Sequence, residues 1–239
     1  NMTGSTFNGT VSLEMNVNAS TNGFVVHALG LNFTSVVYTD SATLQSYRDQ
    51  ITLTTDTKRE TVSISFGQVQ LPATPSGILD ISFTGSISDS MYGMYWAPYV
   101  DATGNSKKIL STQSEPNYAR TIFPCFDEPN QKAVFGLTLV LPPNSGTSIS
   151  NMPIENTTVG IGEDTRQYIT FKNTPNMSPY LLAFAVGDFV SISGVSNSTY
   201  LPSPIPISVW VPNDGSGTAT ATFGLDMAIR SHAYFESLF

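Results

Sequence analysis

Cysteine, charged residues and long apolar runs are all scarce in this chain of 239 residues. Cys125 is the only cysteine, which excludes an internal disulfide and any metal site built from several thiolates. The longest apolar run, 181–186, is far shorter than the roughly 20 residues that a membrane-spanning helix needs. The two histidines, His27 and His232, form no HExxH pair, so the sequence predicts no metal-binding residues of that kind within the chain.

The few charges are mostly negative. Lys and Arg number 10 against 18 Asp and Glu, for a net charge of −8, and charged residues make up only 12% of the chain. Nucleic acids and anionic membrane surfaces would be repelled by this charge. The sequence therefore predicts no nucleic-acid partner and favours a cationic ligand.

Asn-X-Ser/Thr sequons are frequent and favour a secreted protein, because N-glycans are added on the secretory route. The chain contains seven sequons, two of which are at Asn1 and Asn176. Pro179 directly follows the Asn176 sequon and makes Asn176 a poor acceptor. We predict glycans on the remaining sites, which are Asn8, Asn18, Asn32, Asn156 and Asn197.

Alternation of apolar and polar residues dominates the first third of the chain and predicts strands with one buried face. Further short β-rich runs follow, separated by Gly, Pro, Asn and Ser, without helical patterns between them. We predict an all-β fold, a large and mainly antiparallel sandwich or saddle. The predicted strands include 7–17, 24–29, 33–38, 62–66, 79–83, 134–140, 168–171, 180–186 and 207–211.

A helical pattern replaces the strands after residue 215. Apolar residues recur at helical spacing, and Asp226 lies four residues before Arg230, as an ion pair on one helix face requires. We predict a β domain over 1–215 and a helix over 216–239 that begins the connection to a further domain.

The stretch TQSEPNYARTIFPCFDEP (112–129) concentrates prolines and charges in one rigid connector. A bend is expected to bring Asp127 and Glu128 back onto Arg120, while Cys125 reads as a small buried residue. Gln113 and Glu115 have no partner nearby in sequence and would share one face of an extended segment. They are either solvated loop residues or an anchor for an ammonium group.

Other polar and aromatic residues have plain structural interpretations. His27 is expected to pack within a strand, and His232 to lie on the surface of the helix. Four clustered aromatic residues either stack a sugar or peptide or pack at the rim of the core. They are Tyr92, Tyr95, Trp96 and Tyr99.

The stretch 112–129 resembles the N-terminal domain of the zinc aminopeptidases related to aminopeptidase N, whose members carry a run close to TQFEPTDARRAFPCFDEP. The sequences HAL (27–29), SNMP (150–153), TPNMS (174–178), YLLAF (180–184) and the final YFESLF are similar to further motifs of that family. Ser114, Trp96 and Thr121 depart from the family pattern and leave substrate preference open.

This resemblance implies an activity for the parent polypeptide, the removal of N-terminal residues from peptides. It implies a zinc ion in a catalytic domain of the same polypeptide, with no catalytic or metal-binding residue in this chain. Gln113 and Glu115 would contact the first side chain and the free amine of the substrate. The expected location is extracellular or at the cell surface, tethered to the membrane through a segment outside this chain, and a homodimer is left open.

Two alternative functions belong to other classes. One is a catalytically inactive homologue that serves as a cell-surface receptor or adhesion module. The other is a sugar-binding β-sandwich that uses the four clustered aromatic residues. An HExxH motif with a downstream Glu in the rest of the parent polypeptide would separate an enzyme from the first alternative, and glycan binding that is lost in Trp96→Ala would indicate the second.

Overall fold

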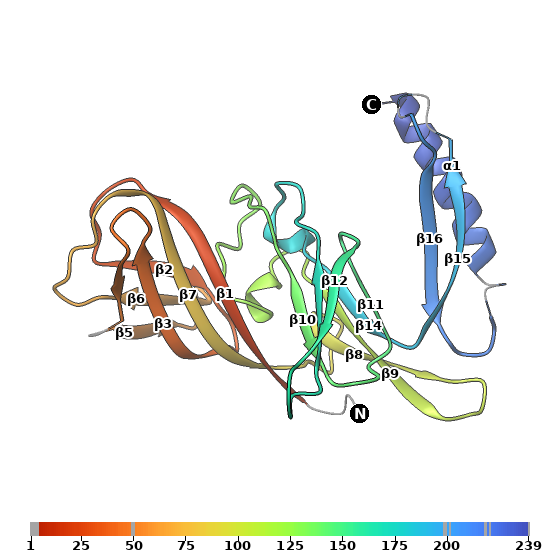
Figure 1. The fold of residues 1–239 in the computed structure, drawn as a ribbon, viewed down its shortest axis with the longest axis horizontal. Coiled ribbons are helices and arrows are strands. Elements are labelled where there is room, and N and C mark those ends of the chain that lie inside the picture. The colour runs from red at the N-terminus through yellow and green to blue at the C-terminus, as the bar shows by residue number, and fades with distance from the viewer. Residues whose placement is uncertain are drawn as a thin grey trace. The chain divides into compact units, whose positions relative to one another are not determined.

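The structure is a computed structural model that describes residues 5–48, 51–197, 200, 202–217, 219 and 221–238. These residues form sixteen strands, two short 3-10 helices and one α-helix (Figure 1). In four of the five sheets every strand pair runs antiparallel, which confirms the predicted all-β, mainly antiparallel fold. The chain falls into two compact units. The first comprises Asn1–Trp96, Ser111–Pro143 and Ile149–Phe184, and the second Ala97–Leu110, Asn144–Ser148 and Ala185–Phe239.

The first unit contains a long, four-stranded sheet with one apolar and one polar face. Its order is β1 (Thr6–Val17), β7 (Thr74–Ser86), β3 (Asn32–Asp40), β4 (Gln45–Tyr47). In β1 every second side chain is exposed, as the alternation predicted. Leu13 lies opposite Leu79 of β7, and Val11 lies opposite Ile81. The register therefore gathers the apolar residues of neighbouring strands on one face.

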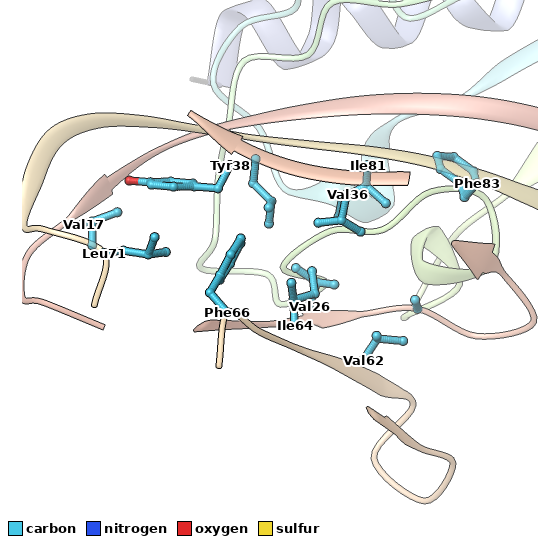
Figure 2. Packing of buried hydrophobic residues seen from close by; sticks show 12 residues of the cluster. Val17, Val26, Val36, Tyr38, Val62, Ile64, Phe66, Leu71, Ile81 and Phe83 are labelled. Carbon is cyan, nitrogen blue, oxygen red and sulfur yellow. The ribbon is translucent and has the colours of Figure 1, made fainter. Parts of the chain in front are cut away.

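A second, three-stranded sheet packs against that apolar face. Its order is β2 (Gly23–His27), β6 (Thr61–Ser65), β5 (Thr52–Asp56). Figure 2 shows Tyr38 and Ile81 of the first sheet above Phe66 and Ile64 at the second. The rings of Phe24 and Tyr38 lie 5.2 Å apart. The buried residues of these two sheets form one hydrophobic core cluster. Each fully buried apolar side chain of this size stabilises the fold by about 1.5–3 kcal/mol.

Two further sheets complete the strand framework. A three-stranded sheet has the order β10 (Thr138–Leu141), β13 (Gln167–Phe171), β12 (Ile154–Val159). A four-stranded sheet has the order β11 (Thr147–Ser150), β14 (Phe184–Gly187), β9 (Ser106–Gln113), β8 (Gly93–Val100). The 3-10 helices are η1 (Ala119–Thr121) and η2 (Pro179–Leu181).

The second unit contains a two-stranded ribbon of β15 (Phe189–Ser196) and β16 (Ile205–Pro212), followed by α1 (Ala221–Leu238). A Cβ on Gly194 would lie 2.9 Å from the Ile229 side chain, so the glycine allows the helix to approach the ribbon closely. The predicted pair on the helix is present, with Arg230 Nε 3.0 Å from Asp226 Oδ2. The helix lies within the predicted range 216–239, while the division into domains at residue 215 stays a prediction.

Two predicted strands are wrong in part. The strand expected over 134–140 starts only at Thr138, because the backbone of Phe135 bonds instead to Thr174, through its hydroxyl at 2.9 Å and its N–H at 3.0 Å. The strand expected over 180–186 starts only at Phe184. The Asn151 side chain bonds to the backbone of residues 181 and 183, which replaces the strand ladder there.

Candidate substrate-contact loop

Gln113 and Glu115 lie where β9 ends and the proline-rich connector begins. Both are exposed, while Ser114 between them is 4% exposed. This alternation is that of an extended segment with one face outward, as the sequence predicted. The Thr112 hydroxyl accepts a hydrogen bond from Phe184 N at 2.9 Å and donates one to Phe184 O at 3.1 Å. The strand end that carries Gln113 is thereby fixed to β14.

A tight turn follows Glu115. Tyr118 N donates to Ser114 O at 2.7 Å, which closes the turn around Glu115, and η1 continues directly from it. The peptide bond between Glu115 and Pro116 is cis. Glu115 therefore stands on a short turn that is bounded on one side by β9 and on the other by η1.

Arg120 holds η1 through two carboxylates from different parts of the chain. Its Nε donates to Asp127 Oδ2 at 2.9 Å, and its Nη1 donates to Glu60 Oε2 at 2.9 Å. The Arg120 and Asp127 side chains are 9% and 2% exposed. The predicted pairing with Asp127 is confirmed, whereas pairing with Glu128 is wrong among the described residues, because Glu128 is exposed and the second partner is Glu60.

Glu60 was missed by sequence reasoning because it lies 60 residues from Arg120. It ends the turn between β5 and β6 with a φ of 56°, in the left-handed region. Its carbonyl accepts from Ala28 N at 2.9 Å. A non-glycine residue in that region is uncommon, and this is the one local signal that the turn has a special role.

His27 and Cys125 join the connector to β2. His27 N donates to Cys125 O at 2.8 Å, Cys125 N donates to His27 O at 3.2 Å, and Asp127 N donates to His27 Nδ1 at 3.2 Å. Burial, and then the Arg120 guanidinium, lowers the pKa of His27 below its ordinary value of 6.5. Burial raises the pKa of the Cys125 thiol, which is 3% exposed. The expected roles of both as packed residues are confirmed.

The aromatic residues are spread over different environments. Tyr92 is 53% exposed and stacks on Tyr118 with ring centroids 4.7 Å apart. Tyr95, Trp96 and Tyr99 are each partly buried. Tyr118 closes the turn after Glu115, so the Tyr92–Tyr118 pair packs beside this loop.

The remaining predicted sites lie outside this loop. His232 is half-buried on α1, with Nδ1 3.2 Å from Ser196 Oγ. The part of the chain that the structure describes holds no group of three His, Cys, Asp or Glu side chains that could bind a metal, so these residues do not fit a zinc site. Among the described residues, no helix combines the length and the apolar character that crossing a membrane requires.

The predicted glycosylation sites are all exposed. Three lie within strands, Asn8 in β1, Asn32 in β3 and Asn156 in β12. Asn18 directly follows β1, and Asn197 directly follows β15. Whether they carry glycans stays a prediction. Of the two sequons that were set aside, Asn176 is exposed but its Ser178 is buried, and Asn1 lies outside the described residues.

Comparison with known proteins places this loop in a family context. The chain is 38% identical over 193 residues to a protein of Saccharomyces cerevisiae named aminopeptidase 2, mitochondrial. The aligned region covers 77% of this chain and 19% of that protein. It is 32% identical over 236 residues to aminopeptidase N of Plutella xylostella, covering 96% and 24%. It is 29% identical over 242 residues to endoplasmic reticulum aminopeptidase 1 of Homo sapiens, covering 100% and 24%. The chain thus spans only about a fifth to a quarter of these relatives. Residues 1–181 match the peptidase M1 N-terminal domain. The chain belongs to the family of peptidase M1 N-terminal domains.

Proposed function

We propose that this chain is the N-terminal β domain of a zinc-dependent aminopeptidase that removes N-terminal residues from peptides outside the cell or at its surface. Family membership and the names of the relatives support the activity. Those names point to different compartments, so the extracellular location rests on the sequons and the low content of charged residues. The zinc ion of this proposal belongs to a catalytic domain of the same polypeptide.

The pair Gln113 and Glu115 carries the proposal for this chain. Both side chains are exposed on one side of a segment whose middle residue, Ser114, is buried. The segment is fixed before Gln113 by the Thr112 hydrogen bonds and after Glu115 by the buried Arg120 network. A binding residue needs such a rigid support, because small displacements weaken directional contacts.

A free peptide amine is the ligand that Glu115 fits. At neutral pH the amine is an ammonium, and a carboxylate that binds it makes a charge-assisted hydrogen bond worth about 1.5–3 kcal/mol. The net charge of −8 favours the approach of a cationic peptide end. Gln113 offers an amide that both donates and accepts, and it would border the first side chain of the substrate.

The proposal is tested with Glu115→Ala in the full-length protein. We expect kcat/KM to fall about ten- to a hundredfold, because each factor of ten corresponds to about 1.4 kcal/mol of lost binding to the transition state. The Tm should stay at the wild-type value, because the carboxylate is exposed and forms no hydrogen bond or ion pair among the described residues. Steady-state kinetics and melting are measured on the same preparation.

Glu155→Ala is the matched control, since Glu155 is an exposed carboxylate on β12. It should change neither quantity. A lower Tm with unchanged kcat/KM in Glu115→Ala would show that Glu115 only supports the loop. A wild-type protein that releases no N-terminal residues would contradict the enzyme proposal and favour the inactive receptor homologue.

A further inference from the structure

The sequons that fall within strands all lie on strands with an open side. β1 is the outer strand of the sheet β1-β7-β3-β4, and β12 is the outer strand of the sheet β10-β13-β12. Among the described residues β3 is also open over most of its length, because β4 pairs only with Tyr38–Asp40. None of the central strands β6, β7, β9, β13 and β14 contains a sequon within the described residues.

Asn8 and Asn32 occupy one row across the first sheet. Asn8 of β1 and Asn32 of β3 both lie directly opposite Thr84 of β7. Residues directly opposite each other share a face, so both asparagines project from the face turned away from the core. Neighbouring strands lie about 4.8 Å apart, which places the two backbones about 10 Å from each other. Both asparagines are exposed.

The open edges beside these asparagines lack two of the usual protections against strand addition. Free N–H and C=O groups at a sheet edge can pair with another chain, and proteins commonly prevent this with lysine, proline, a β-bulge or a covering segment. The register of β3 shifts between Phe33 and Ser35, and that of β1 between Met15 and Val17, so the regular edges are residues 6–15 of β1 and 35–37 of β3. Neither β1 nor residues 32–37 of β3 contains Lys or Pro. Within the described residues no strand pairs with the outer edge of β1 or with residues 32–37 on the side away from β7.

The edge of β3 also borders an open groove of about 400 Å³. Residues 33–37 line this groove together with Arg48, Ile51 and Leu53. Leu53 belongs to β5, the outer strand of the second sheet, so residues of two outer strand segments line the groove. An extended segment of another molecule would find both backbone partners and apolar side chains there.

We propose that N-glycans on Asn8 and Asn32 cap these two open edges and keep the protein from associating through them. This inference rests on the secretory location within the proposed function. The amide nitrogen Nδ2 bonds to the anomeric carbon of an oligosaccharide carried on a lipid diphosphate. The bond from that carbon to the diphosphate oxygen breaks, the lipid diphosphate leaves with the electron pair, and the amide loses one proton. Thr10 and Thr34 supply the hydroxyls that complete the two sequons.

The first test is occupancy in the full-length wild-type protein secreted from a eukaryotic host. Peptide mapping before and after glycosidase treatment should find a glycan on both Asn8 and Asn32. An unoccupied asparagine at either position overturns the inference. The aminopeptidase activity of the same sample is measured separately, so that loss of the proposed function and loss of the proposed caps are distinguishable.

The second test is self-association without the two glycans. Asn8→Gln with Thr34→Ala removes both sequons, and we expect its monomer peak in size-exclusion chromatography with light scattering to be lost to larger species. Asn8→Gln with Thr34→Ser retains the β3 glycan and is expected to retain more monomer. Thr34 is exposed, so neither Thr34→Ala nor Thr34→Ser changes the core.

A charged residue on the bare edge separates edge pairing from a general loss of solubility. Adding Ser35→Lys, at an exposed position of β3, to the glycan-free variant should raise the fraction of monomer, because lysine opposes strand addition at that edge while β1 stays bare. Endoglycosidase trimming of the folded wild-type protein avoids any folding defect of the variants and should reproduce the association. A glycan-free variant and a trimmed protein that both remain monomeric would overturn the inference.

Discussion

Arg120 and Asp127 bind each other through three hydrogen bonds. Arg120 donates from Nε at 2.9 Å and from its backbone N at 3.2 Å to Asp127 Oδ2, and from Nη2 at 3.1 Å to Asp127 O. Because both side chains are buried, neither charge could be solvated if the other were removed. This pair determines the path of the connector that follows Glu115.

Removing one partner of this pair is expected to destabilise the protein strongly. Asp127→Ala should reduce the free energy of unfolding by about 3–5 kcal/mol, because it leaves a buried guanidinium without its main partner. Glu60→Ala should reduce it less, since that carboxylate is 33% exposed. Urea unfolding of each variant measures the loss.

Asp226→Ala is the control for an exposed ion pair. The side chains of Arg230 and Asp226 are 72% and 50% exposed, so the loss should be only about 0.3–0.5 kcal/mol. Equal losses for Asp127→Ala and Asp226→Ala would contradict the structural role of the buried pair.

The stability of the protein should depend on His27 below neutral pH. Its folded-state pKa lies below the ordinary 6.5, so the unfolded state binds a proton more readily than the folded state. The stabilisation is fully present above pH 6.5 and is lost as the pH falls through the lowered pKa. Arg120, Asp127, Glu128 and Glu60 are the charged groups around the ring.

His27→Gln isolates this contribution, because glutamine retains an acceptor but does not titrate. Urea unfolding at pH 7.5, 6.5 and 5.5 should show a steeper decline for the wild-type protein than for the variant. Parallel declines would mean that the protonation of His27 is not linked to folding.

Cys125 is expected to react slowly with a bulky thiol reagent in the native protein. The residue is 3% exposed, and burial raises the pKa of its thiol, so little thiolate is available. Mass spectrometry after timed labelling measures the rate. Lys58→Cys supplies an exposed thiol as a control and should label rapidly. Native Cys125 that labels at the rate of the control would show that the connector opens readily.

Gln113→Ala is expected to change substrate preference more than overall rate, on the proposal that its amide borders the first side chain. A panel of aminoacyl substrates measured with the full-length enzyme should show a changed ranking of kcat/KM. Gln131→Ala removes an exposed amide two residues beyond the connector as a control and should preserve the ranking. An unchanged ranking in Gln113→Ala would remove Gln113 from the proposed contact.

Local sequence patterns predicted nine of the sixteen strands, two of them only in part, and much of the loop. Alternation in β1 and in β7 placed their apolar residues on one face, because successive side chains of a strand point to opposite sides. The prolines around Cys125 predicted a rigid connector, since proline restricts the backbone on its own. The outward pair of Gln113 and Glu115 followed from the same alternation.

Tertiary packing decided which distant groups meet. Glu60, and not Glu128, completes the ion pairs of Arg120, because the turn between β5 and β6 approaches the connector only after the sheets have packed. Strand sequence also does not state which neighbour a strand receives, so the open edges of β1 and β3 emerged only from the sheet order. Local periodicity indicates on which face of its strand a side chain lies. Contacts between segments that are far apart in sequence depend on the packing of the whole unit.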